Sequence, residues 1–182
     1  DLEIFSGVWK KKYKNNKNIY VSVAWSGWGK VSAARAAARI MGISYKKSPI
    51  NFLLFTGVAG AVEEKLRQWD IIVPTSLIQH DMDARPIFEK YEIPALRTKF
   101  IVPETKWLNW SIELINNSIK KQLLNEFGRV HSGVIATGDK FVNDVSFANN
   151  LKQDIKGLLA VEMEGAAVAQ VATQESIPWQ II

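Results

Sequence analysis

Apolar residues recur along the chain with two different periods, which predict strands in some stretches and helices in others. Residues 3–9 and 18–25 have the composition of strands, and the second stretch alternates apolar with other side chains. Residues 30–41 are rich in alanine and carry apolar side chains at helical spacing, with Gly42 as the expected end. This part of the chain is therefore expected to form a strand hairpin followed by a helix.

The rest of the chain repeats this order of strand and helix. Short apolar runs predict buried strands at residues 51–55, 70–78, 129–136 and 158–161. Helical spacing predicts helices at residues 103–127, 144–151 and 165–172. Strands that alternate with helices predict an α/β fold with a largely parallel sheet, whose site lies at the strand ends.

Residues 84–99 have no clean period. They contain Pro86 and Pro94 together with several apolar and aromatic side chains, among them Ile87 and Phe88. A segment of this kind within a compact domain is usually functional or part of an interface. We expect its apolar groups to be exposed and to form the contact of a twofold homodimer.

Composition and charge narrow the classes of function. A chain of 182 residues fits one domain. The net charge is +5, but the excess lies in the lysine-rich residues 10–17, which we interpret as a solvated hairpin turn, so no nucleic-acid partner is expected. Cysteine is absent, which excludes disulfides. No apolar run reaches the roughly 18 residues of a membrane span and no signal peptide is visible, so we expect a cytoplasmic protein without a membrane partner.

Two carboxylates, Glu162 and Glu164, lie where a predicted buried strand meets a predicted helix. Residues two apart in an extended segment share one face, and unpaired buried carboxylates cost several kcal/mol. One interpretation is that both face a polar cleft or ligand. The other is that one of them caps the helix N-terminus, where a carboxylate contributes about 0.3 to 1 kcal/mol. The local sequence leaves both open.

Other candidate groups have two interpretations each. Phe141 follows a glycine turn, where it either stacks on a planar base or packs in the core. His80, Asp81 and Asp83 either hold a divalent ion or form a polar loop at a strand end. With two histidines and no cysteine, a conventional zinc site is not expected, and we predict no metal site.

Four segments occur in the order and spacing of one protein family: Ser26-Gly27-Trp28-Gly29-Lys30, Thr56-Gly57-Val58-Ala59-Gly60, Thr137-Gly138-Asp139-Lys140-Phe141-Val142 and Val161-Glu162-Met163-Glu164. Over nearly all its length the chain resembles the 5′-methylthioadenosine/S-adenosylhomocysteine nucleosidases of the purine nucleoside phosphorylase superfamily. The resemblance implies a single three-layer domain over residues 1–182, with a mixed, largely parallel sheet flanked by helices. It also implies a homodimeric hydrolase without cofactors that cleaves the N-glycosidic bond of an adenine nucleoside and releases adenine, in purine nucleoside metabolism and methionine salvage.

The resemblance further implies roles for single residues. Phe141 is expected to stack on the purine, while the backbone of Val142 binds the edge of the base. Met163 is expected to lie along the sugar, and Glu164 to accept hydrogen bonds from the ribose hydroxyls with Glu162 close by. Charge-assisted hydrogen bonds of this kind are about twice as strong as neutral ones.

Trp28 falls where the family contacts the sugar, and the turn Val58-Ala59-Gly60 is expected to pass beneath it. Phosphorylases of the superfamily commonly hold phosphate with an arginine and a hydroxyl where this chain has Phe55 and Val58. Water is therefore the expected nucleophile. The alternatives are a phosphate-dependent phosphorylase and an inactive nucleoside-binding homologue.

The two catalytic groups of the family are expected to fall outside this sequence. Its water-activating glutamate would precede residue 1, and its purine-protonating aspartate would follow residue 182. We therefore expect no catalytic residue within the chain, a chain that is incomplete at both ends, and no turnover by residues 1–182 alone.

Overall fold

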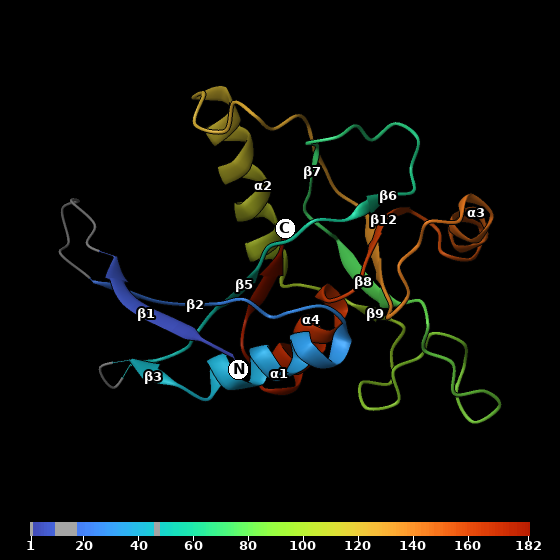
Figure 1. Cartoon of the computed structure of the whole chain (residues 1–182), viewed down its shortest axis with the longest axis horizontal. Helices are drawn as coiled ribbons and strands as arrows, with labels where there is room; N and C mark the ends of the chain where they lie inside the picture. Colours follow the sequence, from blue (N-terminus) through green and yellow to red (C-terminus); the bar gives the residue numbers. More distant parts are fainter. Residues whose placement is uncertain (1, 10–17, 46–47) are drawn as a thin grey trace.

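The computed structural model describes residues 2–9, 18–45 and 48–182, and its elements are shown in Figure 1. The helices are α1 (Lys30–Met41), α2 (Thr105–Lys120), α3 (Val145–Asp154) and α4 (Gly165–Gln174). One sheet has five strands, in the order β6 (Gly60–Ala61), β12 (Leu158–Glu162), β11 (Val134–Thr137), β8 (Ser76–Gln79) and β9 (Phe100–Ile101). Two-stranded pairings join β1 (Ile4–Trp9) to β2 (Ile19–Ala24), β5 (Leu53–Phe55) to β13 (Trp179–Ile181), β7 (Ile71–Ile72) to β10 (Val130–His131), and β3 (Ser44–Tyr45) to β4 (Ser48–Pro49).

The five-stranded sheet is mixed and largely parallel, as predicted. Its three central strands β12, β11 and β8 are parallel, while the edge strands β6 and β9 run antiparallel to their neighbours. The register aligns Gln79, Thr137 and Glu162 in one row across the carboxyl ends of the central strands. Polar groups from three strands therefore meet at one edge of the sheet.

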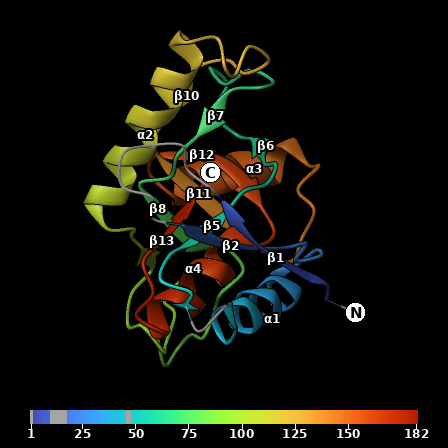
Figure 2. The ribbon, with the colours of Figure 1, turned by 90° about the vertical axis from the view of Figure 1, so that its left-hand side faces the viewer.

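Helices cover both faces of this sheet and give the predicted three layers. Leu77 and Ile135 point to a core shared with α1 and α4, whereas their neighbours Ile78 and Ala136 point to a second core shared with Leu151 of α3. This alternation is the two-residue period of a strand that is buried on both sides. Helices α1 and α4 lie side by side in both views of the ribbon (Figures 1 and 2).

Small side chains line the contact between α1 and α4. Ala33 and Ala37 of α1 and Ala166 and Ala169 of α4 are all buried in the same core. Because the distance between packed helices depends on the side chains at their contact, alanines allow a close approach. The N-termini of the two helices meet at the edge of the sheet that carries the polar row, as the hydrogen bond from Gly29 to Glu164 shows.

Several predicted elements have different limits in the structure. The predicted strand at 70–78 is interrupted at Pro74, which has no N–H to donate to a neighbouring strand. The predicted strand at 129–136 is interrupted at Gly133, where an added Cβ would lie 2.7 Å from the Leu159 side chain. The predicted helix at 103–127 ends at Lys120, and Gln122 then adopts a positive φ of 58°.

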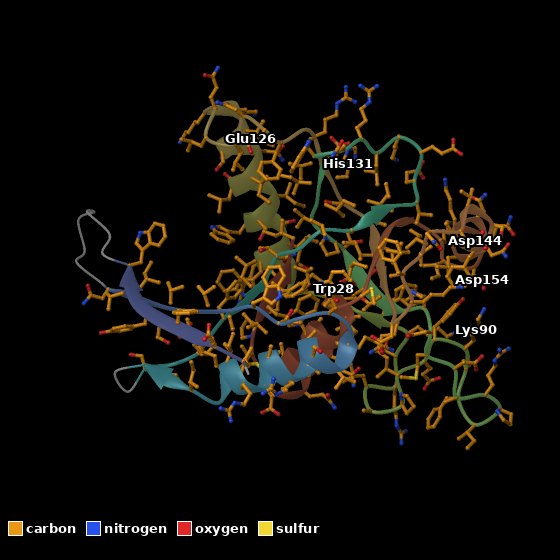
Figure 3. All side chains as sticks on the ribbon, viewed as in Figure 1. Trp28, Lys90, Glu126, His131, Asp144 and Asp154 are labelled. Carbon is orange, nitrogen blue, oxygen red and sulfur yellow. The ribbon has the colours of Figure 1, made fainter. Side chains whose placement is uncertain are left out.

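The segment 84–99 is less exposed than predicted. Ile87 is 82% exposed, but Tyr91 and Ile93 are buried in the two cores, so most of the expected apolar patch is absent. The segment is also tied to the end of α3, because Lys90 Nζ and Tyr91 Oη both bind Asp154 Oδ2, at 2.6 and 2.9 Å. Lys90 and Asp154 are labelled in Figure 3.

Two sequence interpretations are limited by what the structure describes. The lysine-rich residues 10–17 lie outside the described residues. Within the described part of the chain, every helix is too short or too polar to cross a membrane.

Candidate functional site

Glu162 ends β12 and caps the N-terminus of α4. Its Oε2 accepts hydrogen bonds from the backbone N–H groups of Glu164 and Gly165, at 2.7 and 2.6 Å, and its Oε1 accepts one from the hydroxyl of Thr137. Burial raises the pKa of the Glu162 carboxyl above its ordinary value, since it outweighs these donors, and the charge of nearby Glu164 acts in the same direction. Of the two interpretations left open by the sequence, helix capping is confirmed for Glu162.

Glu164 is oriented by a different segment. Its Oε1 accepts a hydrogen bond of 2.6 Å from the backbone N–H of Gly29, which precedes α1. Gly29 has φ of 86°, a backbone conformation that glycine adopts without steric strain. Among the described residues, none donates a hydrogen bond to Oε2 of Glu164. One oxygen of this half-buried carboxylate is thus fixed at the positive end of a helix, and the other is available to a ligand.

The turn at residues 58–60 runs beside these carboxylates. Gly60 pairs with Val161 in the antiparallel contact of β6 with β12, one residue before Glu162. Val58 and Ala59 precede this pair and are exposed, Val58 to 95%. The sheet pairing therefore brings together two segments that the sequence analysis assigned to one site.

Phe141 and Val142 follow β11 in the connection to α3. Phe141 is 72% exposed, so the interpretation of Phe141 as a core side chain is wrong. Val142 is half-buried and packs with Val62 against the core on the α3 face of the sheet. The turn is anchored where Gly138 contacts His80, because an added Cβ at position 138 would overlap the imidazole ring.

Trp28 and Met163 are the predicted sugar contacts, and both lie next to residues that the hydrogen bond of Gly29 to Glu164 joins. Trp28 is 76% exposed and belongs to the turn before α1 (Figure 3), directly before the glycine that binds Glu164. Met163 is half-buried between Glu162 and Glu164. Of the two predicted sugar contacts, Trp28 is thus an exposed side chain and Met163 a half-buried one.

The alternative of a divalent ion at His80, Asp81 and Asp83 is not supported by the geometry. Asp81 Oδ1 accepts from Lys30 Nζ at 2.6 Å, and Asp83 Oδ2 pairs with Arg85 Nη2 at 2.5 Å. No group of three His, Cys, Asp or Glu side chains that could hold a metal occurs among the residues that the structure describes. Burial lowers the pKa of His80, which favours a neutral imidazole.

A polar network that lies close to the two carboxylates was not predicted from the sequence. Lys30 Nζ donates to Asp81 and, at 3.2 Å, to Gln79 Oε1, while Gln79 Nε2 donates to Gln170 of α4 at 2.7 Å. The N–H of Lys30 donates to Asp139 Oδ1 at 2.7 Å. The available signal was the position of Gln79 and Thr137 at the ends of buried strands, where a polar side chain needs a partner.

Comparison with known proteins agrees with this geometry. The model of the phosphorylase superfamily matches residues 9–182. The 5′-methylthioadenosine/S-adenosylhomocysteine nucleosidase of Staphylococcus carnosus is 31% identical over 100% of this chain and 75% of its own length.

Two solved structures from Helicobacter pylori are also similar. One is a 5′-methylthioadenosine/S-adenosylhomocysteine nucleosidase with butyl-thio-DADMe-Immucillin-A, with a TM-score of 0.74 and 30% identity over 98% of this chain and 68% of that one. The other is a futalosine hydrolase mutant, with a TM-score of 0.71 and 28% identity over 100% of this chain and 78% of that one.

The chain spans 63% to 66% of the length of the first curated relatives that it matches. The match nevertheless includes all four motif segments and the sheet edge at which their residues meet. The chain belongs to the phosphorylase superfamily and, within it, to the family of the 5′-methylthioadenosine/S-adenosylhomocysteine nucleosidases.

Proposed function

We propose that this protein acts in hydrolysis of the N-glycosidic bond of 5′-methylthioadenosine, S-adenosylhomocysteine or a related nucleoside, with release of the base. The observation that carries the proposal is the geometry of Glu164. Its Oε1 is held by the Gly29 N–H and its Oε2 has no donor among the described residues, so a carboxylate is preorganised to accept hydrogen bonds from a ribose diol.

The electrostatics of Glu164 fit the chemistry of glycosidic cleavage. Positive charge develops on the sugar ring as the bond to the base breaks. A fixed carboxylate on the ribose hydroxyls stabilises that charge more than it stabilises the neutral substrate, which is the condition for faster reaction. Glu162 supports this arrangement indirectly, because it fixes the backbone of Glu164 through the capping hydrogen bond.

The remaining ligand contacts are proposed on accessibility and family resemblance. Phe141, whose ring is largely exposed, stacks on the base, and the backbone of Val142 binds the edge of the base. Met163 and Trp28 contact the sugar, since the first is partly accessible and the second is exposed next to Gly29.

Water is the proposed nucleophile. The turn Val58-Ala59-Gly60 presents an exposed valine where phosphorylases of the superfamily commonly have a hydroxyl for phosphate, and Phe55 stands in place of their arginine. An apolar side chain cannot donate hydrogen bonds to a phosphate ion.

The test measures release of the free base from 5′-methylthioadenosine, S-adenosylhomocysteine and futalosine. The reactions are run with and without phosphate, and chromatography detects the base. Hydrolysis that is independent of phosphate supports the proposal, and activity that requires phosphate identifies a phosphorylase. Calorimetric binding of 5′-methylthioadenosine without turnover would show that residues 1–182 bind the nucleoside but do not by themselves cleave it, as the sequence analysis expects. Glu164→Gln is compared with Glu175→Gln, an exposed glutamate just beyond the other end of α4, which should behave as wild type.

The proposal includes an assembly and a location. We propose that residues 1–182 form a single nucleosidase/phosphorylase-like domain, in a cytoplasmic homodimer. Exposed apolar side chains support self-association, namely Ile87 and one face of the β1–β2 hairpin with Phe5, Trp9 and Val23. Sedimentation at micromolar concentration tests the dimer, and fractionation of cells with an antibody to the chain tests the location.

A further inference from the structure

Three residues from three different segments of the chain close a ring of hydrogen bonds beside the candidate site. Lys30 Nζ donates to Asp81 Oδ1 at 2.6 Å, and the N–H of Asp139 donates to Asp81 Oδ2 at 2.9 Å. The N–H of Lys30 then donates to Asp139 Oδ1 at 2.7 Å. The Lys30–Asp81–Asp139 ring thus joins the start of α1 to the segments that follow β8 and β11.

The ring is partly shielded from water. The side chains of Lys30 and Asp81 are 19% and 31% exposed. Burial alone would raise the pKa of Asp81, but the Lys30 ammonium and the Asp139 N–H more than offset it and hold the pKa below the ordinary value. Asp81 is therefore ionised at neutral pH and can accept both hydrogen bonds at once.

Two members of the ring, Lys30 and Asp139, are close in sequence to residues with proposed roles in the site. Gly29, next to Lys30, donates its N–H to Glu164. Phe141 lies two residues after Asp139 in the same turn. Lys30 also contacts Gln79, which binds Gln170 of α4, so the helix that begins after Glu164 is tied to the same cation.

We propose that Lys30 is a positioning residue for nucleoside binding, which rests on the proposed function above. Its ring holds the base-contacting turn at Phe141 at a fixed distance from the ribose-contacting carboxylate of Glu164. A nucleoside has its base and ribose joined by one bond, so it gains from both contacts only when that distance is correct. Free adenine needs only the turn and is indifferent to the distance.

This difference between ligands provides the test. Dissociation constants for 5′-methylthioadenosine and for adenine are measured by calorimetry for wild type, Lys30→Gln, Lys30→Arg and the control Lys106→Gln, a solvent-exposed lysine on α2. Lys30→Gln should weaken nucleoside binding roughly 10-fold or more and adenine binding by less than about 3-fold, on the scale of losses from misplaced binding groups. Lys30→Arg keeps the cation and should recover part of the loss, while Lys106→Gln should match wild type.

A double-mutant cycle with Asp81→Asn sharpens the result. An asparagine offers one oxygen where the aspartate offers two, so the ring opens as it does in Lys30→Gln. If the ring acts as a unit, the double variant loses little more than either single variant. Equal losses for nucleoside and adenine in Lys30→Gln would overturn the proposal, because they indicate general disruption of the fold.

Amide hydrogen exchange separates this proposal from the proposed function. Faster exchange at residues 138–143 is expected in Lys30→Gln and not in Lys106→Gln. If wild type binds neither ligand, the proposed function fails. If exchange at residues 138–143 is unchanged in Lys30→Gln, the ring does not order the turn, and the positioning role is refuted as well. If wild type binds both ligands and Lys30→Gln keeps the wild-type ratio of affinities, only the positioning role is refuted.

Discussion

Replacement of Thr137 by valine tests the link between the sheet and the two carboxylates. The Thr137 side chain is fully buried, its hydroxyl donates to Glu162 Oε1, and the same oxygen accepts from the N–H of Ala166 at 2.9 Å. Valine has nearly the same shape but no hydroxyl. The variant therefore removes one donor from a buried carboxylate and leaves one helix N–H without its partner.

The size of the effect follows from these two losses. A buried donor without a partner costs about 1 to 3 kcal/mol, and a hydrogen bond to a charged group contributes about 1.5 to 3 kcal/mol. Because one hydroxyl serves both, the terms overlap, and we expect Thr137→Val to lower the free energy of unfolding by about 2 to 4 kcal/mol. For a chain of this length the melting temperature should fall by about 5 to 15 °C.

Thr137→Ser is the matched comparison, since it keeps the hydroxyl and removes one methyl group. The loss of a buried methyl should cost about 1 kcal/mol. Urea unfolding followed by tryptophan fluorescence then gives the order wild type, serine, valine, with similar slopes against urea concentration. Valine as stable as serine, or more stable, would mean that the methyl contact and not the hydroxyl secures this position.

Three further predictions concern the site. Glu164→Gln keeps the shape of the side chain but weakens the ribose acceptor, so kcat/KM in an active enzyme should fall roughly 10²-fold, and an unchanged value would exclude Glu164 from the site. Phe141→Ala should weaken nucleoside binding by about 1 to 3 kcal/mol as measured by calorimetry, whereas Phe127→Ala, outside the site, should not. Burial lowers the pKa of His80, so as the pH falls the imidazole takes up a proton in the unfolded chain before it does so in the folded chain. The contribution of His80 to stability is therefore complete above the unfolded pKa of about 6.5 and is lost as the pH falls through the folded pKa. Unfolding free energies from pH 5 to 8 should therefore depend less steeply on pH in His80→Gln, and parallel curves would contradict the assignment.

Periodicity predicted the main elements because burial on one face leaves a local pattern. Residues 30–41 form α1 with the predicted limits, and the predicted helix at 165–172 continues only to Gln174. The short edge strand β6 was not predicted, since two residues within a glycine turn carry no period. Its pairing with β12 depends on residues about a hundred positions away.

The position of the site in the chain could be predicted from the sequence, but the hydrogen bonds that orient its side chains could not. The sequence located Glu162 and Glu164 at a strand-to-helix junction, yet the role of each depends on its donors. Glu162 binds amides two and three residues later, whereas Glu164 binds Gly29, at a separation of 135 residues. Lys30 appears as an ordinary charge at a helix start until Asp81 is brought beside it by the fold. Such long-range partners leave no periodic signal.

The hydrogen bonds at the start of α1 also bear on how the chain folds during synthesis. Helix α1 has no acidic residue in its first turn and no side-chain cap from Gly29, so its first amides are capped by Glu164 and Asp139 from far along the chain. During synthesis, more than a hundred further residues must therefore be added before the first amides of α1 have their hydrogen-bond acceptors. Its end should fray until β12 and α4 dock, which makes late closure of long loops a step in forming the site. The edge of the sheet that carries the site is therefore expected to form late in folding, when these long-range contacts close.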